Sequence, residues 1–161
     1  MPLPGCPSSS ATIASQSFPK PMKILVAESN HILATVLADH LVAGGHQAMP
    51  AYEGRLATIF CQKQDFDAIV IEFLMPDIYG IDVLEQLHAQ GRMPRPIIIT
   101  GFPELLEEVT PRLAAVGADT VIFKPFIFAE VDAALARFAS ADADTGAVTS
   151  RRPQYQRISV N

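Results

Sequence analysis

Residues 67–80, with the sequence DAIVIEFLMPDIYG, decide how the rest of the chain folds. The apolar run 68–73 is rich in β-branched residues and is followed by the turn residues Met75, Pro76 and Gly80. A short apolar run bounded by turn residues is typical of a strand that is covered by other elements on both faces. The run contains one acid, Glu72, near its end, and an unpaired charge there is costly. The sequence therefore predicts a buried strand and a charged partner for Glu72.

Three further runs of the same kind occur at 23–27, 96–100 and 121–123, and helix-period segments at 30–43, 81–89 and 127–138 lie between or after these runs. Strands that alternate with helices predict a parallel sheet with right-handed crossovers. The apolar stripes expected to face the sheet are Ile32, Leu33, Val36, Leu37, His40 and Leu41; Ile81, Leu84 and Leu87; and Val131, Leu135 and Phe138.

The remaining strand candidate, 46–51, contains Pro50, which cannot donate a hydrogen bond within a central strand. An edge position for this strand agrees with the order 2-1-3-4-5, so we predict an α/β, flavodoxin-like (βα)5 doubly wound fold. Thr110 followed by Pro111 is typical of a helix start, so we expect a helix to begin there and 104–109 to form a separate turn or short helix.

Both ends of the chain differ in composition from the middle. We expect a Pro- and Ser-rich tail at 1–21, with Met22 an alternative start, a domain at 22–139 and a flexible tail at 140–161. The first segment lacks the apolar core of a signal peptide, and the chain has no apolar run of the roughly 20 residues that a membrane span needs. The net charge of −5 gives no general attraction to nucleic acid. Two cysteines imply no disulfide framework, so we expect a cytoplasmic protein.

Polar residues follow each of the central strands in turn. They are Glu28-Ser29, Glu72, Thr100-Gly101 and Lys124-Pro125. The carboxyl ends of the strands in a doubly wound sheet meet at one edge, where functional groups lie. We therefore expect Glu28, Glu72, Thr100 and Lys124 to form one site.

This series, together with Met75-Pro76, Gly80, 117–119 and Lys124-Pro125-Phe126, resembles the receiver domains of bacterial response regulators over about 23–138. In that family an aspartate at the position of Glu72 accepts a phosphoryl group from histidine. The resemblance implies a Mg²⁺ site made by Glu28, Glu72 and the backbone carbonyl of Leu74. However, Ser29 replaces an acid of that site, and the extra methylene of Glu72 moves its oxygens by about 1.5 Å, where ~1 Å can cost ~10²-fold in rate.

The departures from the family pattern predict a degenerate site. We expect Mg²⁺ to be weakly bound or absent, with no other cofactor, and Glu72 to pair with Lys124 beside the hydroxyl of Thr100. In the family, the corresponding threonine acts together with an aromatic residue in a conformational switch. Val121 stands at the position of that aromatic residue, so we do not expect this switch here. Two alternatives remain open from the residues alone: Ser29 caps the following helix, and Glu28 is a solvated rim acid.

We therefore expect a stand-alone atypical receiver that is not an enzyme and acts through protein contacts, independently of phosphorylation. The alternative is a receiver regulated by weak Mg²⁺-dependent phosphorylation, or by a small anion or cyclic dinucleotide, which Arg151, Arg152 and Arg157 could help to bind. The resemblance implies a histidine kinase, a phosphotransfer protein or an effector as partner, without a DNA-binding domain. It also suggests a homodimer through the face at about 104–138, where Ile127 and Phe128 are candidate contacts.

Overall fold

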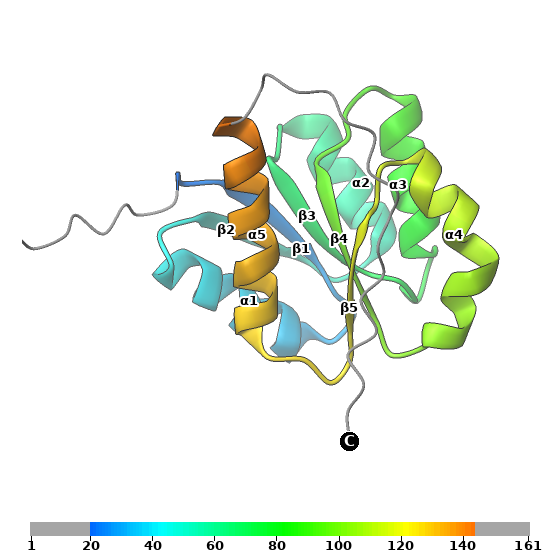
Figure 1. Cartoon of the computed structure of the whole chain (residues 1–161), viewed down its shortest axis with the longest axis horizontal. Helices are drawn as coiled ribbons and strands as arrows, with labels where there is room; N and C mark the ends of the chain where they lie inside the picture. The colour runs from blue at the N-terminus through cyan, green and yellow to red at the C-terminus, as the bar shows by residue number, and fades with distance from the viewer. Residues whose placement is uncertain (1–19, 144–161) are drawn as a thin grey trace, which may run out of the picture.

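The computed structural model describes residues 20–143, which form a five-stranded parallel sheet between two layers of helices (Figure 1). The strand order is β2-β1-β3-β4-β5, as the sequence predicts for a flavodoxin-like fold. The strands are β1 Lys23–Ala27, β2 Gln47–Ala51, β3 Ala68–Glu72, β4 Arg95–Thr100 and β5 Thr120–Phe123. The helices are α1 His31–Ala43, α2 Gly54–Lys63, α3 Gly80–Ala89, the 3₁₀ helix η1 Pro103–Leu105, α4 Leu106–Ala115 and α5 Phe128–Ala143.

The strand pattern follows from burial on both faces of the sheet. In β3, Ile69 and Ile71 pack in the core under α2, α3 and α4, whereas Ala68 and Val70 pack in the core under α1 and α5. Successive side chains on a strand point to opposite faces, so a strand covered on both sides must be apolar throughout. Pro50 lies on the edge strand β2, as predicted.

Helix α4 differs from the prediction that a helix begins at Thr110. It runs without a break from Leu106 to Ala115 and includes Pro111, while the hydroxyl of Thr110 donates to the carbonyl of Leu106. Leu106 and Leu113 are both buried, so packing at each end of the helix offsets the hydrogen bond that Pro111 cannot make.

Helix α1 buries only part of the predicted stripe: Leu37 and Leu41 are buried as expected, whereas Ile32 and Val36 are not. Ile32 and Val36 are 78% and 47% exposed, and the residues that pack on the sheet are Ala34, Leu37, Ala38 and Leu41. The two alanines let the helix backbone approach the sheet closely, so the large aliphatic residues at 32 and 36 are left outside. The stripes of α3 and α5 are buried as expected.

The structure also extends one predicted helix and contains a helix that was not predicted. Helix α5 continues to Ala143, four residues beyond the expected end of the domain, and α2 has no counterpart among the helix-period segments identified from the sequence. The proposed tails fall mainly on 1–19 and 144–161, outside the described residues. Within 20–143, no helix is long and apolar enough to cross a membrane.

Candidate functional site: one lysine between two glutamates

The expected site residues Glu28, Glu72 and Lys124 meet at the carboxyl edge of the sheet. β1 ends at Ala27, β3 ends at Glu72 itself and β5 ends at Phe123, so three parallel strands of the sheet bring the three side chains to the same edge. Nζ of Lys124 lies 2.8 Å from Oε2 of Glu28 and 2.8 Å from Oε1 of Glu72. We call these three residues the charge cluster.

The charge cluster is largely removed from water. The side chain of Glu28 is 3% exposed, that of Glu72 15% and that of Lys124 26%. Charges in such a place are stable only when they are paired and hydrogen-bonded. The predicted partner of Glu72 is therefore present, but the lysine is shared with a second acid that the sequence did not pair with it.

Backbone amides at the start of α1 bind the glutamate oxygens. The amide of Asn30 donates to Oε1 of Glu28 over 2.9 Å, and both the amide (3.1 Å) and the hydroxyl of Ser29 donate to Oε2 of Glu72. Oε2 of Glu28 has no hydrogen-bond partner among the described residues and has only its ion pair with Lys124. Ser29 thus holds Glu72 in place, in addition to occupying the position of a family acid.

The three ionisable groups respond differently to this environment. Burial raises the pKa of Glu28 above its usual value, despite its contacts with Lys124 and Asn30. Burial alone would also raise the pKa of Glu72, but hydrogen bonds from Lys124 and Ser29 hold that pKa below its usual value. Burial alone would lower the pKa of Lys124, but its contacts with the carboxylates of Glu28 and Glu72 raise it. Glu72 and Lys124 therefore form the firmly ionised pair of the cluster.

Both alternatives left open for Glu28 and Ser29 are wrong. Glu28 is buried, so it is no solvated rim acid. Asn30 rather than Ser29 caps α1, since Oδ1 of Asn30 accepts from the amides of Ile32 and Leu33, each over 3.1 Å. With the cap supplied by the next residue, the side chain of Ser29 is free to bind Glu72.

The other two expected residues, Thr100 and Leu74, lie less directly at the site. Thr100 is buried at the end of β4, its hydroxyl oxygen accepts from the amide of Phe102 over 3.0 Å, and its carbonyl accepts from the amide of Lys124 over 2.8 Å. It positions the backbone of Lys124. Leu74 is half-buried against the core between the sheet and α2, α3 and α4.

Two residues of the turn after β3 have roles that the sequence reading missed. Both oxygens of Asp77 accept from the first amides of α2, at Gly54 and Arg55, each over 2.8 Å. A Cβ at Gly80 would lie 2.3 Å from the carbonyl oxygen of Glu72, so only glycine fits there. No local signal in the sequence indicates the role of Asp77, because the helix that it caps begins 23 residues earlier in the chain.

The donor set does not fit the Mg²⁺ ion that the family pattern implies. Mg²⁺ favours an octahedron of oxygen ligands that includes one or two free carboxylates. Here both carboxylates contact the ammonium of Lys124, and a hydroxyl stands where a further acid would be needed. Residues 20–143 contain no group of three His, Cys, Asp or Glu residues arranged to hold a metal.

The fold and the arrangement of residues at its carboxyl edge define a receiver domain, a signalling module of two-component systems. The response regulator receiver domain family matches residues 24–136, and the chain belongs to this family.

The relatives include transcriptional regulators. The chain is 28% identical over 131 residues to the regulatory protein VanRc of Enterococcus gallinarum. This alignment covers 79% of this chain and 55% of VanRc. It is 31% identical over 111 residues to the alkaline phosphatase synthesis transcriptional regulatory protein PhoP of Bacillus subtilis (strain 168). This alignment covers 69% of this chain and 45% of PhoP. The chain thus spans about half the length of these relatives.

A solved structure supports the same assignment. The receiver domain of Francisella response regulator 1452 is 25% identical and superposes with a TM-score of 0.67, covering 75% of this chain and 98% of that one.

Proposed function

We propose that this receiver works independently of phosphorylation, as a protein-contact module of two-component signalling whose former phosphorylation site is held in one state by the charge cluster. The observation that carries the proposal is the position of Lys124, 2.8 Å from a carboxylate oxygen of each of Glu28 and Glu72. The resemblance to the family would assign this lysine to an incoming phosphoryl group.

Electrostatics supports this proposal. Phosphoryl transfer requires positive charge to neutralise the oxygens of the transferred group. When its members are ionised, the charge cluster holds two negative charges and one positive charge, so its net charge repels another anion. A phosphate or cyclic dinucleotide would have to displace a glutamate from Lys124 before it could use that lysine.

The length of Glu72 also supports a fixed state. The extra methylene lets the carboxylate reach Lys124 directly while Ser29 binds its second oxygen. This arrangement partly reproduces the contacts expected of a phosphorylated aspartate. Val121 stands where the family has the aromatic residue of its conformational switch, which argues against signalling through that switch.

One atom favours the second candidate, a receiver with residual Mg²⁺-dependent phosphorylation. Oε2 of Glu28 lacks a hydrogen-bond partner among residues 20–143 and retains capacity to bind a cation. Regulation by a small anion or a cyclic dinucleotide is a further alternative, and Arg151, Arg152 and Arg157, which could help to bind such a ligand, lie outside the described residues.

Protein contacts at the face formed by α4, β5 and α5 belong to the same proposal, either with a signalling partner or with a second copy. Ile127 is 67% exposed and available for such a contact. Phe128, the other candidate, is only partly exposed and packs against His40 of α1 with ring centroids 5.1 Å apart.

The decisive experiment exposes the protein to acetyl phosphate, and separately to beryllofluoride, in the presence of Mg²⁺. We expect no phosphoryl adduct in the intact mass and no shift of the backbone amide signals of Ser29, Asn30 and Lys124. Mg²⁺ alone should also leave these signals unchanged at sub-millimolar concentration. A stoichiometric adduct on Glu72 would establish the second candidate instead.

A further inference from the structure

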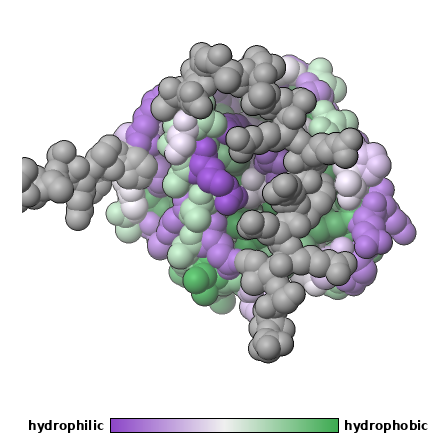
Figure 2. Space-filling view, in the orientation of Figure 1, coloured by the Kyte–Doolittle hydropathy of each residue, from purple (hydrophilic) through white to green (hydrophobic). Residues whose placement is uncertain are grey.

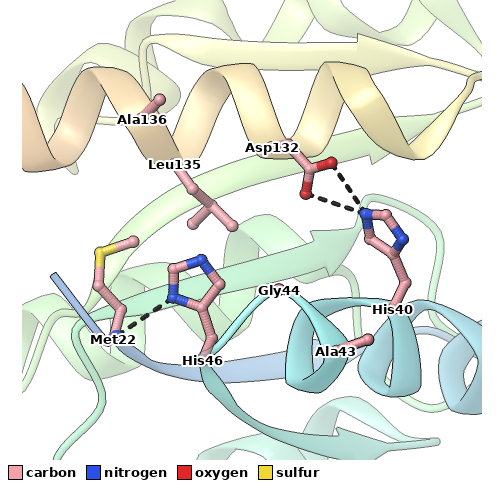
Figure 3. Close-up of a pocket in the computed structure, with 8 residues that line it drawn as sticks. All are labelled: Met22, His40, Ala43, Gly44, His46, Asp132, Leu135 and Ala136. Atoms are coloured by element: carbon pink, nitrogen blue, oxygen red, sulfur yellow. Dashed lines mark hydrogen bonds and ion pairs between the residues drawn. The ribbon is translucent and has the colours of Figure 1, made fainter. Parts of the chain in front are cut away.

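A cavity of about 360 Å³ lies between α1 and α5, beside the first residues of β1 (Figure 3). Its volume is within the range of natural ligand sites. Its apolar walls come from three elements: Met22 before β1, Ala43 at the end of α1, and Leu135 and Ala136 on α5. Ala43 and Ala136 are exposed, so the cavity opens to the surface, and their short side chains leave room for a large side chain between the helices.

His46 offers a hydrogen-bond donor to this cavity. Its Nδ1 lies 3.2 Å from the backbone amide of Met22. An amide can only donate, so Nδ1 accepts and the proton of the neutral ring is on Nε2. Figure 3 shows this nitrogen on the side of the ring that faces Leu135 of α5. The cavity therefore has a fixed N–H group that suits a carbonyl oxygen.

Asp132 supplies the opposite chemistry at the other end. Its two carboxylate oxygens lie 2.8 and 3.1 Å from Nε2 of His40, and its side chain is 46% exposed (Figure 3). His40 is in turn held against Phe128, so the carboxylate has a fixed position with lone pairs still open to solvent. A partly exposed, positioned carboxylate suits an ammonium or guanidinium group.

The described charged side chains of α1 and α5 are mainly acidic. The described side chains of α1 and α5 include the carboxylates Asp39, Glu130 and Asp132 and one Lys or Arg residue, Arg137. Arg137 is five positions from Asp132, whereas Ala136 is four positions away and shares its helix face. The side of α5 that lines the cavity thus presents an acid without an adjacent arginine.

From these features we infer that the α1–α5 cavity is a peptide-docking site for a segment that presents a large apolar side chain next to lysine or arginine. The apolar side chain fills the space between Ala43 and Ala136, the basic residue meets Asp132, and a peptide carbonyl accepts from Nε2 of His46. A peptide can present an apolar side chain, a basic side chain and a backbone carbonyl within a few residues of one another. A basic peptide of a protein partner therefore meets the three requirements better than a lipid does. This site is separate from the charge cluster.

The test is a titration of the full ¹⁵N-labelled chain followed by amide chemical shifts. Acetyl-Lys-Phe-Lys-amide should bind with a dissociation constant of about 1 mM, typical of weak single-site contacts. The shifts should centre on Ala43, Gly44, His46 and Ala136. Acetyl-Glu-Phe-Glu-amide and acetyl-Lys-Ala-Lys-amide should each bind at least about tenfold more weakly, because they lack the cation or the apolar group.

Matched variants decide whether the cavity is responsible. Ala136→Phe fills it and should abolish the shifts, whereas Ala133→Phe, an exposed alanine on α5 that does not line the cavity, should bind as the wild type does. Asp132→Asn should remove the preference for the lysine peptide over the glutamate peptide. Thermal melts confirm that each variant is folded. No binding by the Lys-Phe-Lys peptide, shifts centred elsewhere, or unchanged binding in Ala136→Phe would overturn the inference.

Discussion

Nζ of Lys124 lies 2.8 Å from Oε1 of Glu72, and the same nitrogen lies 2.8 Å from Oε2 of Glu28. One cation is therefore shared by two carboxylates that are both largely removed from water. Because the cation is shared, the three groups cannot be treated as one ion pair and one bystander. This dependence determines what mutation and pH should do to the protein.

Replacing Lys124 by alanine should strongly destabilise the fold. The change leaves two buried carboxylates without a cation, and breaking a buried pair typically costs about 3–5 kcal/mol. Urea unfolding of Lys124→Ala measures the loss. Lys63→Ala, an exposed lysine on α2, is the control and should change the free energy of unfolding by less than about 0.5 kcal/mol. Equal effects of the two changes would show that the charge cluster contributes nothing to stability.

The same cluster predicts a particular order of rescue. Glu72→Gln combined with Lys124→Met should recover only part of the stability, because Glu28 still lacks a cation. Adding Glu28→Gln should recover more, and the gain should be non-additive because the three residues are in contact. If the double variant is already as stable as the triple variant, Glu28 does not depend on Lys124.

The two glutamates should affect stability with opposite dependence on pH. The pKa of Glu28 is raised above 4.5 in the folded state, so its contribution is fully present below pH 4.5 and is lost as the pH rises through the folded pKa. The pKa of Glu72 is lowered, so its contribution is present above pH 4.5 and is lost as the pH falls through the folded pKa.

Urea unfolding at a series of pH values separates the two contributions. The stability of the wild type relative to Glu28→Gln should fall as the pH rises above 4.5. Its stability relative to Glu72→Gln should instead rise as the pH approaches 4.5 from below. Slopes of the same sign would contradict the assignment of the ionised pair to Glu72 and Lys124.

The sequence predicted those features that depend on local composition. The apolar runs located β1, β3, β4 and β5, Pro50 located the edge strand, and the strand ends placed Glu28, Glu72 and Lys124 at one edge. The faces of the helices were harder to predict. Apolar and polar residues are mixed on the surface that is visible in Figure 2. Large apolar side chains such as Ile32 and Val36 are exposed. Burial of Ala34 and Ala38 decided the face of α1, and a stripe of large residues cannot reveal that.

Two of the missed contacts join residues far apart in the chain. Asp77 caps a helix 23 residues earlier in the sequence, and Glu28 shares a lysine that is 96 positions away. Similarly, α4 continues through Pro111 because Leu106 and Leu113 pack on the core, which local helix-start signals do not report. Tertiary packing overrode the local pattern in this case.

Asp77→Ala should weaken the start of α2. The carboxylate accepts the amides of Gly54 and Arg55, and its pKa is lowered because these and other backbone hydrogen bonds outweigh the effect of burial. Loss of such a cap typically costs about 1 kcal/mol. Urea unfolding should show this loss, whereas Asp65→Ala, whose side chain is 99% exposed, should be nearly neutral. A neutral Asp77→Ala would mean that solvent replaces the cap without cost.

Gly80→Ala should disrupt the turn that follows β3. The added Cβ would lie 2.3 Å from the carbonyl oxygen of Glu72, which is backbone and cannot move aside without distorting the site. We expect a loss of more than about 2 kcal/mol in urea unfolding. Gly101→Ala is the matched control, because its nearest neighbour would be Cβ of Lys124 at 3.9 Å. If both alanines are tolerated equally, the turn is not constrained by this contact.

The last prediction concerns return of phosphorylation to the site. Glu72→Asp shortens the side chain and should release Lys124 from its direct contact, but the site is then still short of an acid for Mg²⁺. Glu72→Asp alone should therefore remain unlabelled by acetyl phosphate, whereas Ser29→Asp with Glu72→Asp should acquire Mg²⁺-dependent labelling, seen as a phosphoryl adduct in the intact mass.

The matched control is Ser29→Ala with Glu72→Asp, which removes the same hydroxyl without adding an acid and should stay unlabelled. Labelling of this control would show that Ser29 blocks the chemistry by binding residue 72 and not by the absence of a metal ligand. Robust labelling of the wild-type protein at Glu72 would refute phosphorylation-independent function altogether, because Lys124 would then have to leave Glu72 for the incoming phosphoryl group.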